Sequence, residues 1–222
     1  MHESKTEIKK MWQIISATAP CILELRAIWP NGLPLRRPTL VKHFKSADYT
    51  SLDECKANFE NIALELNHIG YNVYAVMNPI SLSFTGKAVS DKDIIHREVL
   101  LIDIDRTGTK SAPATDHEIL EARCLADDIH DFMASQNWPT PVRVLSGNVY
   151  HLYYPVPGLP NAVKATLFIK DLLLFLHENY SNDIVEIDTT VFNASRITKV
   201  VGTIARKGLE SDGRPYRMAR VL

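Results

Sequence analysis

Apolar residues recur along the chain with two different spacings, which divide it into helical and extended segments. A spacing of three to four residues predicts helices over 5–16, 51–69 and 162–177, and a further helix that begins at 115. Runs rich in β-branched and aliphatic residues predict strands over 21–29, 72–77, 98–103, 141–145, 149–155 and 184–188. The pattern contains no internal repeat and predicts a mixed globular fold.

Short polar signals mark where two of these helices begin. Ser51 followed by Glu54, and Thr115 followed by Glu118, have the spacing of a capping box. In that motif the hydroxyl and the acidic side chain each accept a hydrogen bond from a backbone N–H that the helix leaves without a partner. Gly70 is placed to end the second helix in the left-handed conformation that glycine adopts readily.

From residue 98 onward the predicted order is strand, helix, strand, strand, helix, strand. This is the split βαβ, or ferredoxin-like, order. Its first strand lies between the third and the fourth and runs antiparallel to both. The end of the first strand therefore lies beside the starts of the other two. We expect three separated segments, 103–105, 146–151 and 188, to meet at one edge of the sheet.

The first of these segments carries two carboxylates. Asp103 and Asp105 stand two apart at the end of a strand, so their side chains project from the same face. Neighbouring carboxylates raise the cost of ionising one another, and a divalent cation removes that cost. Their oxygen atoms suit Mg²⁺ or Mn²⁺. A solvated strand end is the alternative interpretation of this motif taken alone.

Asp188 is positioned to complete a cation site from the last strand. Glu186 stands two residues before Asp188, so its side chain projects from the same face of the strand, and it is the alternative candidate for the third metal ligand. Asp188 also suits a simpler structural role, because Asp commonly caps a turn such as the one predicted at Thr189 and Thr190.

Two further segments offer groups that bind phosphate. Ser146, Gly147 and Asn148 form a tight turn whose backbone N–H groups suit an anion, and His151 follows as a donor to a phosphate oxygen. Downstream, the stretch 193–207 contains Arg196 and Lys199. Taken alone, His151 is also consistent with a structural histidine whose hydrogen bonds are satisfied. The stretch 193–207, taken alone, is also consistent with a basic surface loop.

Charge is unevenly distributed, although the net charge of −1 gives no sign of a nucleic-acid partner. Residues 1–45 carry eight Lys/Arg and three Asp/Glu, and residues 196–222 carry seven and two. The segment 46–195 carries ten basic and twenty-one acidic residues. Two basic ends around an acidic centre suit a phosphate-rich ligand held over carboxylates that bind cations, but chance clustering on solvated faces gives the same counts.

The composition also argues against several classes of protein. The three cysteines, Cys21, Cys55 and Cys124, lie far apart without CxxC spacing, which disfavours a zinc site and a disulfide scaffold and indicates a reducing cytoplasm. No apolar run reaches the roughly 18 residues that span a membrane. The N-terminus lacks the pattern of a secretory signal.

In combination, the motifs resemble those of the archaeo-eukaryotic primase superfamily, in the primase–polymerase branch found in plasmids, viruses and other mobile elements. The resemblance extends over about 70–207. Residues 101–105 are similar to the family's first motif, an acid–x–acid pair that binds metal, and Asp188 is similar to the third, its last metal carboxylate. Residues 146–153 are similar to the second motif, usually S-G-x-G-x-H, whose Ser and His contact the incoming triphosphate.

The chain departs from the family pattern at three positions. Val149 replaces the second glycine of the second motif. Lys199 stands where arginine is common, and Val201 where proline is common. All three departures lie in the segments predicted to contact triphosphate, whereas the three predicted metal ligands match the pattern.

The resemblance implies an α+β fold and a DNA primase or DNA polymerase. A ferredoxin-like, RRM-like palm over 97–222 would pack with an N-terminal α/β module over 1–96 in one catalytic domain, 1–222. Two Mg²⁺ or Mn²⁺ ions would be held by Asp103, Asp105 and Asp188. The dNTP or NTP substrate would be bound by Ser146, Gly147, Asn148, His151, Arg196 and Lys199. Candidates for contact with the DNA template and primer are Arg36, Arg37, Lys42 and Lys45.

Three other interpretations remain at this point. A replication initiator that nicks DNA needs paired histidines beside a tyrosine, and the chain has no His-x-His. A non-catalytic RNA-binding module would stack bases on exposed strand aromatics, for which Tyr150, Tyr153 and Tyr154 are candidates. A degenerate relative would bind nucleotide without synthesis. We also expect 216–222 to form a strand and the chain to belong to a longer protein, with a helicase as the fused or associated partner.

Overall fold

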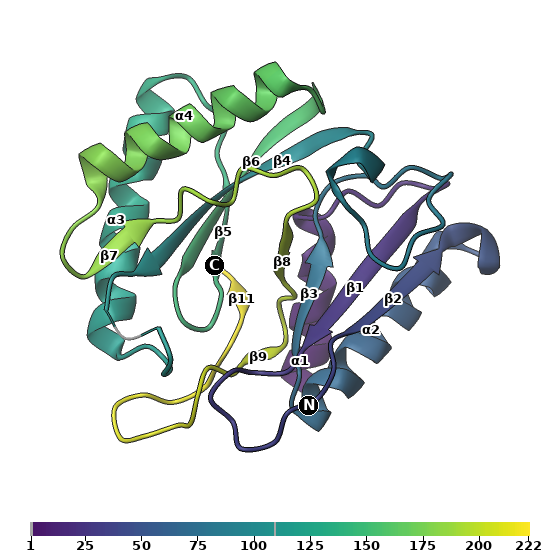
Figure 1. Ribbon diagram of the computed structural model, residues 1–222, viewed down its shortest axis with the longest axis horizontal. Helices are drawn as coiled ribbons and strands as arrows, with labels where there is room; N and C mark the ends of the chain where they lie inside the picture. The colour runs from purple at the N-terminus through teal and green to yellow at the C-terminus, as the bar shows by residue number, and fades with distance from the viewer. Residues whose placement is uncertain (1, 109) are drawn as a thin grey trace.

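The computed structural model describes residues 2–108 and 110–222 and contains two principal antiparallel sheets with helices on their outer faces (Figure 1). The first part of the chain forms α1 (His2–Glu7), η1 (Ile8–Gln13), β1 (Ile22–Ile28), β2 (Leu40–Lys45), η2 (Ser46–Asp48), α2 (Leu52–Ile69), β3 (Asn72–Val76) and η3 (Asp91–Asp93). The remainder forms β4 (His96–Arg106), α3 (Asp116–Ser135), β5 (Val142–Leu145), β6 (Tyr150–Pro160), α4 (Val163–Tyr180), β7 (Val185–Ile187), β8 (Ile197–Lys199), β9 (Ile204–Ala205), β10 (Arg217–Met218) and β11 (Arg220–Val221). The α+β class is confirmed.

The larger sheet has the strand order β11-β5-β6-β4-β7. Strand β4 lies between β6 and β7 and is antiparallel to both, as the order of the elements predicted. The register places Asp103 opposite His151, and Asp105 opposite Glu186. Residues directly opposite one another in an antiparallel pair project from the same face. These four side chains therefore share one face of the sheet.

The opposite face of β4 is apolar and lies under the helices. Leu100, Ile102 and Ile104 are at most 2% exposed and alternate with the two aspartates. Helices α3 and α4 cover this side of the sheet in Figure 1. Because side chains alternate along a strand, burying these three residues turns Asp103 and Asp105 away from the helices.

The smaller sheet has the order β2-β1-β3-β8 and packs against α2. Strand β2 was not predicted, because Phe44 is its only buried residue and the strand lies at a sheet edge. Strand β8 was not predicted either: residues 197–199 pair with β3. After β7 of the larger sheet, the chain therefore returns to the smaller sheet and adds β8 as its fourth strand.

The helix boundaries agree with the predicted signals in two of three cases. Gly70 ends α2 with a φ of 119°, as predicted. At α3 the capping box is complete, since Thr115 Oγ1 accepts from Glu118 N and Glu118 Oε2 accepts from Thr115 N. At α2 the prediction was half right: Ser51 Oγ accepts from Glu54 N, but the Glu54 carboxylate accepts from Thr50 instead of Ser51. Over 5–16, the predicted helix is replaced by α1 and the 3₁₀ segment η1.

Cys21, Cys55 and Cys124 are free thiols. Over 2–108 and 110–222, no helix has the length and apolar character required to traverse a lipid bilayer.

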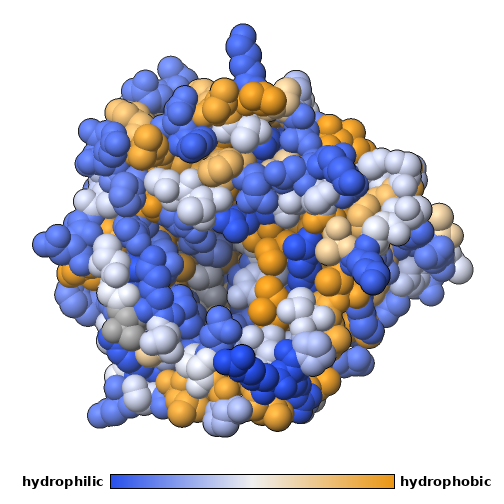
Figure 2. Space-filling view, in the orientation of Figure 1, coloured by the Kyte–Doolittle hydropathy of each residue, from blue (hydrophilic) through white to orange (hydrophobic). Residues whose placement is uncertain are grey.

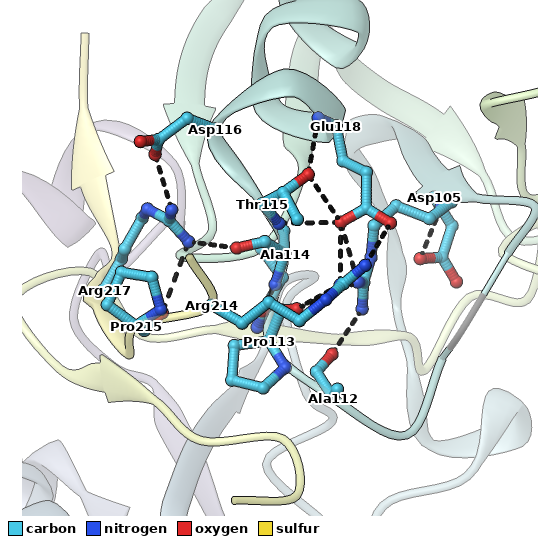
Figure 3. Close-up of polar contacts among 12 residues, drawn as sticks. Asp105, Ala112, Pro113, Ala114, Thr115, Asp116, Glu118, Arg214, Pro215 and Arg217 are labelled. Carbon is cyan, nitrogen blue, oxygen red and sulfur yellow. Dashed lines mark hydrogen bonds and ion pairs between the residues drawn. The ribbon is translucent and has the colours of Figure 1, made fainter. Parts of the chain in front are cut away.

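The start of α3 is held by a cluster of arginines around one carboxylate (Figure 3). Arg106 is fully buried and donates to Glu118 Oε2 at 3.3 Å and to carbonyl oxygens of 112 and 113. Arg214, near the end of the chain, donates to the same Glu118 oxygen at 3.0 Å. The C-terminal segment is therefore fastened to the loop that connects β4 to α3.

We expect Glu118→Gln to destabilise the protein by roughly 2 kcal/mol at pH 7, because it leaves the buried guanidinium of Arg106 and the part-buried guanidinium of Arg214 without their counter-charge. Burial acts to raise the pKa of Glu118, but hydrogen bonds from Thr115 and Arg214 and the charge of Arg106 outweigh it and lower that pKa. A lowered folded-state pKa stabilises the fold above the unfolded value, about 4.3, and the contribution is lost as pH falls through the folded value. Urea unfolding measures the free energy of unfolding of the variant and of the wild type, and the difference between the two should narrow below about pH 4. A difference in this free energy that stays constant with pH would contradict the prediction.

Candidate functional site

A pocket of about 410 Å³ lies between the two sheets. Figure 2 shows the corresponding face of the molecule hollowed near its centre. Strands β1 and β3 supply residues to one wall, and β4 supplies residues to the other. Of the residues that the sequence predicted for a site, eight line this pocket: Asp103, Asp105, Ser146, Asn148, His151, Asp188, Arg196 and Lys199.

Asp103 occupies the middle of the carboxylate group. Its backbone oxygen accepts from the backbone N–H of Asp188 at 2.8 Å, so the third acid follows directly on the neighbouring strand. Its Oδ1 atom is buried and lies 3.2 Å from His151 Nε2, but without hydrogen-bond geometry. Within the part of the chain that the structure describes, this oxygen has no hydrogen-bond partner. A buried carboxylate oxygen that has one histidine nitrogen nearby and no hydrogen bond retains the capacity to bind a ligand.

The other two aspartates each face a cation of the chain. Asp105 Oδ1 accepts from Arg106 N at 2.8 Å, and its Oδ2 lies 3.4 Å from Lys110 Nζ. Asp188 Oδ1 accepts from Thr190 N and Oγ1, and its Oδ2 lies 3.9 Å from Arg196. Asp188 therefore caps the turn that follows β7 as well as lining the pocket.

The donor set fits Mg²⁺ or Mn²⁺ in its chemistry, although it is not gathered into a tight cluster. Three carboxylates from two adjacent strands line one pocket, and hard oxygen ligands are what these ions prefer. Over the described ranges, no three His, Cys, Asp or Glu side chains approach closely enough to form a metal centre as they stand. Two of the carboxylates lie near basic side chains instead, Asp105 near Lys110 and Asp188 near Arg196.

The local field favours the ionised form of Asp103. Burial acts to raise its pKa, but the charges of His151, Arg196 and Lys207 outweigh burial and hold the pKa below its ordinary value. A carboxylate that stays charged in a partly buried position attracts a cation.

His151 is oriented by a chain of hydroxyl groups. Its Nδ1 atom is 2.8 Å from the hydroxyl of Tyr153, which is 2.5 Å from Thr198 Oγ1. These contacts leave Nε2 directed toward Asp103. Sequence reasoning missed Tyr153 and Thr198 as positioning residues, because their pairing depends on β8 lying over β6.

The turn before β6 is closed by Ser146, whose N–H and hydroxyl both donate to Val149 O. Asn148 accepts from Ala114 N at 3.0 Å and lines the pocket. Gly147 does not line the pocket, although it was predicted to bind nucleotide. It has a φ of 99°, and a Cβ atom there would lie 2.7 Å from Arg217 O. Gly147 therefore packs against the C-terminal segment.

Lys199 is 4% exposed, which was not expected of a residue predicted to contact triphosphate. Its ammonium donates to Asn72 Oδ1 at 3.3 Å and to Ile204 O at 3.2 Å, and lies over the ring of Tyr74. Burial, with the charge of Arg206, lowers its pKa well below the usual range. Arg196 is more open, and its nearest charged partner is Asp188.

The four residues predicted to contact template DNA lie outside the pocket. All are exposed, and Arg37 stacks 4.7 Å from the ring of Trp29, which does line the pocket. Lys42 and Lys45 stand three residues apart on β2, so they project from opposite faces. Of the four, Arg37 is the residue that the structure places against a side chain of the pocket lining.

The pocket also contains cations that were not predicted as site residues, Lys110, Arg206 and Lys207. The last two belong to the basic stretch that begins at Arg196, so composition pointed to them. Lys110 lies in a loop whose sequence gives no sign of its position.

Comparison with solved structures finds folds similar to this one. The primase–polymerase domain of cyanophage S-2L, described as an archaeo-eukaryotic primase domain, aligns over 98% of this chain and 89% of its own, with a TM-score of 0.58 and 15% identity. The primase RepB' aligns over 99% of this chain and 56% of its own (TM-score 0.54, 11% identity). The polymerase domain of Mycobacterium tuberculosis ligase D, in a complex with DNA, aligns over 91% and 75% (TM-score 0.52, 14% identity).

No known family profile matches the sequence, and no curated protein is similar to it in sequence. At 11–15% identity the likeness concerns the fold, which extends over nearly the whole chain. The three structures are a primase–polymerase domain, a primase and a polymerase domain, so the kind of fold that the motifs led us to expect is confirmed. The chain shares its fold with these primase and polymerase structures.

Proposed function

We propose that this protein is the catalytic domain of a metal-dependent primase–polymerase, which transfers nucleotides to a primer or DNA strand under the direction of a template. One observation carries the proposal: carboxylates from separate segments, Asp103, Asp105 and Asp188, line the same pocket as His151 and Arg196. The three neighbours in fold are primases or polymerases, which supports the same reaction class.

In this proposal Asp103, Asp105 and Asp188 hold divalent ions. Bound Mg²⁺ or Mn²⁺ supplies activation of an attacking 3′-hydroxyl and neutralisation of charge on a leaving pyrophosphate. The unpaired Oδ1 of Asp103 and the outward Oδ2 atoms of the other two aspartates are the available ligand atoms.

The remaining pocket residues orient the triphosphate. When Tyr153 donates to Nδ1 of His151, Nε2 carries the proton and donates to a phosphate oxygen. The Arg196 guanidinium offers a planar set of donors on the adjacent wall. Ser146 and Asn148 stabilise the turn beside them, and the buried Lys199 holds β8 in place by donating to Asn72 and to the carbonyl oxygen of Ile204.

The finer description of the domain belongs to the same proposal. Residues 97–222 would form the ferredoxin-like palm and 1–96 the module that closes the pocket opposite it. Template and primer DNA would run along the pocket entrance, where Arg37 stacks on Trp29. One neighbour in fold is a polymerase domain in a complex with DNA, which is consistent with that placement.

The interpretation as a base-stacking RNA-binding module loses its main support. Tyr150, Tyr153 and Tyr154 are at most 7% exposed, so none offers a face to a nucleotide base. Tyr153 lies under Thr198, and Tyr154 packs against the ring of Trp138.

A template-directed synthesis assay tests the proposal. We expect labelled dNTP or NTP to be incorporated on a primed or unprimed template in the presence of Mn²⁺ or Mg²⁺. Chelation with EDTA should abolish incorporation, because without the cations the carboxylates repel the triphosphate. Each nucleotide type is supplied separately, with and without primer. Nucleotide binding without incorporation under every condition would identify a degenerate relative, and nicking of supercoiled plasmid would identify an initiator.

A further inference from the structure

A lysine lies between two carboxylates at the edge of the pocket. Asp105 on β4 and Glu186 on β7 are direct cross-strand partners. Lys110 Nζ donates to Glu186 Oε1 at 2.8 Å and lies 3.4 Å from Asp105 Oδ2. The one ammonium group therefore contacts both acids.

This arrangement relieves a repulsion that the sheet imposes. Like charges directly opposite one another on paired strands destabilise the pair. Neither acid can move away, because the register of β4 with β7 fixes their Cα positions. A cation between them relieves this repulsion at neutral pH, and in this structure Lys110 supplies it.

The loop that carries Lys110 is fastened on both sides of it. Before it, Thr107 N donates to Ile184 O at 3.1 Å and Thr107 Oγ1 donates to Asp183 O at 2.5 Å. After it, carbonyl oxygens of the segment 112–114 accept from Arg106, Arg214 and Arg217, as Figure 3 shows. Lys110 is thus tethered beside the carboxylates by a short span.

The two contacts of Lys110 are unequal. The distance from Lys110 Nζ to Glu186 is 0.6 Å shorter than the distance to Asp105. The contact with Glu186 is a hydrogen bond of ordinary length, whereas the contact with Asp105 is a longer ion pair. Glu186 lies outside the set of acids that line the pocket, whereas Asp105 lies within it. A ligand that displaced Lys110 from Asp105 would therefore leave it bound to Glu186.

We propose that Lys110 is a tethered counter-ion of the candidate metal site: it neutralises Asp105 until a divalent cation displaces it, and Glu186 retains it afterwards. The inference rests on the proposed function in one respect, that Asp105 belongs to a cation site. It assigns Glu186 a role distinct from metal ligation, as the acceptor that holds the displaced lysine.

Binding of Mn²⁺ alone, followed by electron paramagnetic resonance of the free ion, tests this without any turnover. Lys110→Met is expected to lower the Mn²⁺ dissociation constant roughly two- to five-fold, the range of one part-exposed ion pair. Glu186→Gln is expected to raise that constant, because Lys110 then has Asp105 as its remaining partner. Lys110→Arg keeps the charge and should behave like wild type.

A double-mutant cycle separates displacement from a general effect of charge. If Lys110 and Glu186 act together, Glu186→Gln changes Mn²⁺ affinity much less in the Lys110→Met background than in wild type. Equal effects in both backgrounds, or an unchanged dissociation constant in Lys110→Met, would overturn the inference. Both side chains are partly exposed at the pocket edge, and urea unfolding of each variant checks that the fold is retained.

Failure of the proposed function has a different signature in the same titration. If wild type binds no Mn²⁺, or if Asp103→Asn leaves binding unchanged, the carboxylates do not form a cation site and both proposals fall. If Asp103→Asn abolishes binding but Lys110→Met does not strengthen it, the cation site stands and the counter-ion role alone is wrong.

Discussion

Replacement of Asp103 by asparagine is expected to reduce nucleotide incorporation by at least roughly a thousand-fold, because phosphoryl transfer depends on positioned charge and this residue is the central carboxylate. Asp103 has one neighbour of the site on each side, His151 on β6 and Asp188 after β7. Its Oδ1 is the buried carboxylate oxygen that lacks a hydrogen-bond partner in the described ranges. Asparagine keeps the shape and removes the charge.

The measurement is primer extension with Mn²⁺ at saturating nucleotide, compared with urea unfolding of the same preparations. Asp131→Asn is the matched control, because it makes the same chemical change on an exposed part of α3, on the far side of the sheet. We expect that control to retain full activity. Synthesis by Asp103→Asn at even a tenth of the wild-type rate would remove the proposed role.

The convergence of the acids could be predicted from sequence because it depends on topology alone. Once the order of the elements gave a ferredoxin-like sheet, the first strand had to lie between the third and fourth. That placed Asp103 beside Asp188 with no knowledge of side-chain packing, and the hydrogen bond between their backbones confirms it. Alternation along β4 then decided which face both aspartates occupy.

The smaller sheet shows where sequence patterns stop being informative. Strand β8 is three residues long, too short for any period to be visible, and it pairs with a strand more than a hundred residues away. Its pairing places Lys199 opposite Tyr74 and buries it. A basic residue in a basic stretch is expected at the surface, so only the pairing reveals that Lys199 lies beneath the pocket.

The tyrosines of β6 were ambiguous for a related reason. Both faces of this strand are covered, one by the helices and the other by β8, so all three tyrosines are buried although the strand alternates. Alternation distinguishes two faces but does not say whether each is exposed to solvent. For Tyr150, Tyr153 and Tyr154 the covering elements come from other parts of the chain, both before and after β6.

The second large effect is expected at Gly147, where alanine should destabilise the protein by roughly 3 kcal/mol or more. A side chain at its φ of 99° costs about 1–2 kcal/mol in backbone conformation. The added Cβ would also lie 2.6 Å from Ala205 Cβ and 2.7 Å from Arg217 O, and overpacking of this kind costs about 1–3 kcal/mol. Because a backbone oxygen cannot rotate away, the strain must move the hairpin of β9 and β10.

Gly158→Ala separates the two contributions. Gly158 also has a left-handed φ, 70°, but nothing lies within 4 Å of the Cβ position, so alanine there should cost about 1 kcal/mol. Urea unfolding of both variants measures the difference in their free energies of unfolding, which isolates the contact between the Ser146–Asn148 turn and the C-terminal segment.

We expect Gly147→Ala also to slow nucleotide incorporation at temperatures where the variant remains folded, since Ser146 and Asn148 line the pocket. Equal stability of the two variants would show that the turn is not held by that segment, and that the second motif is positioned by β5 and β6 alone.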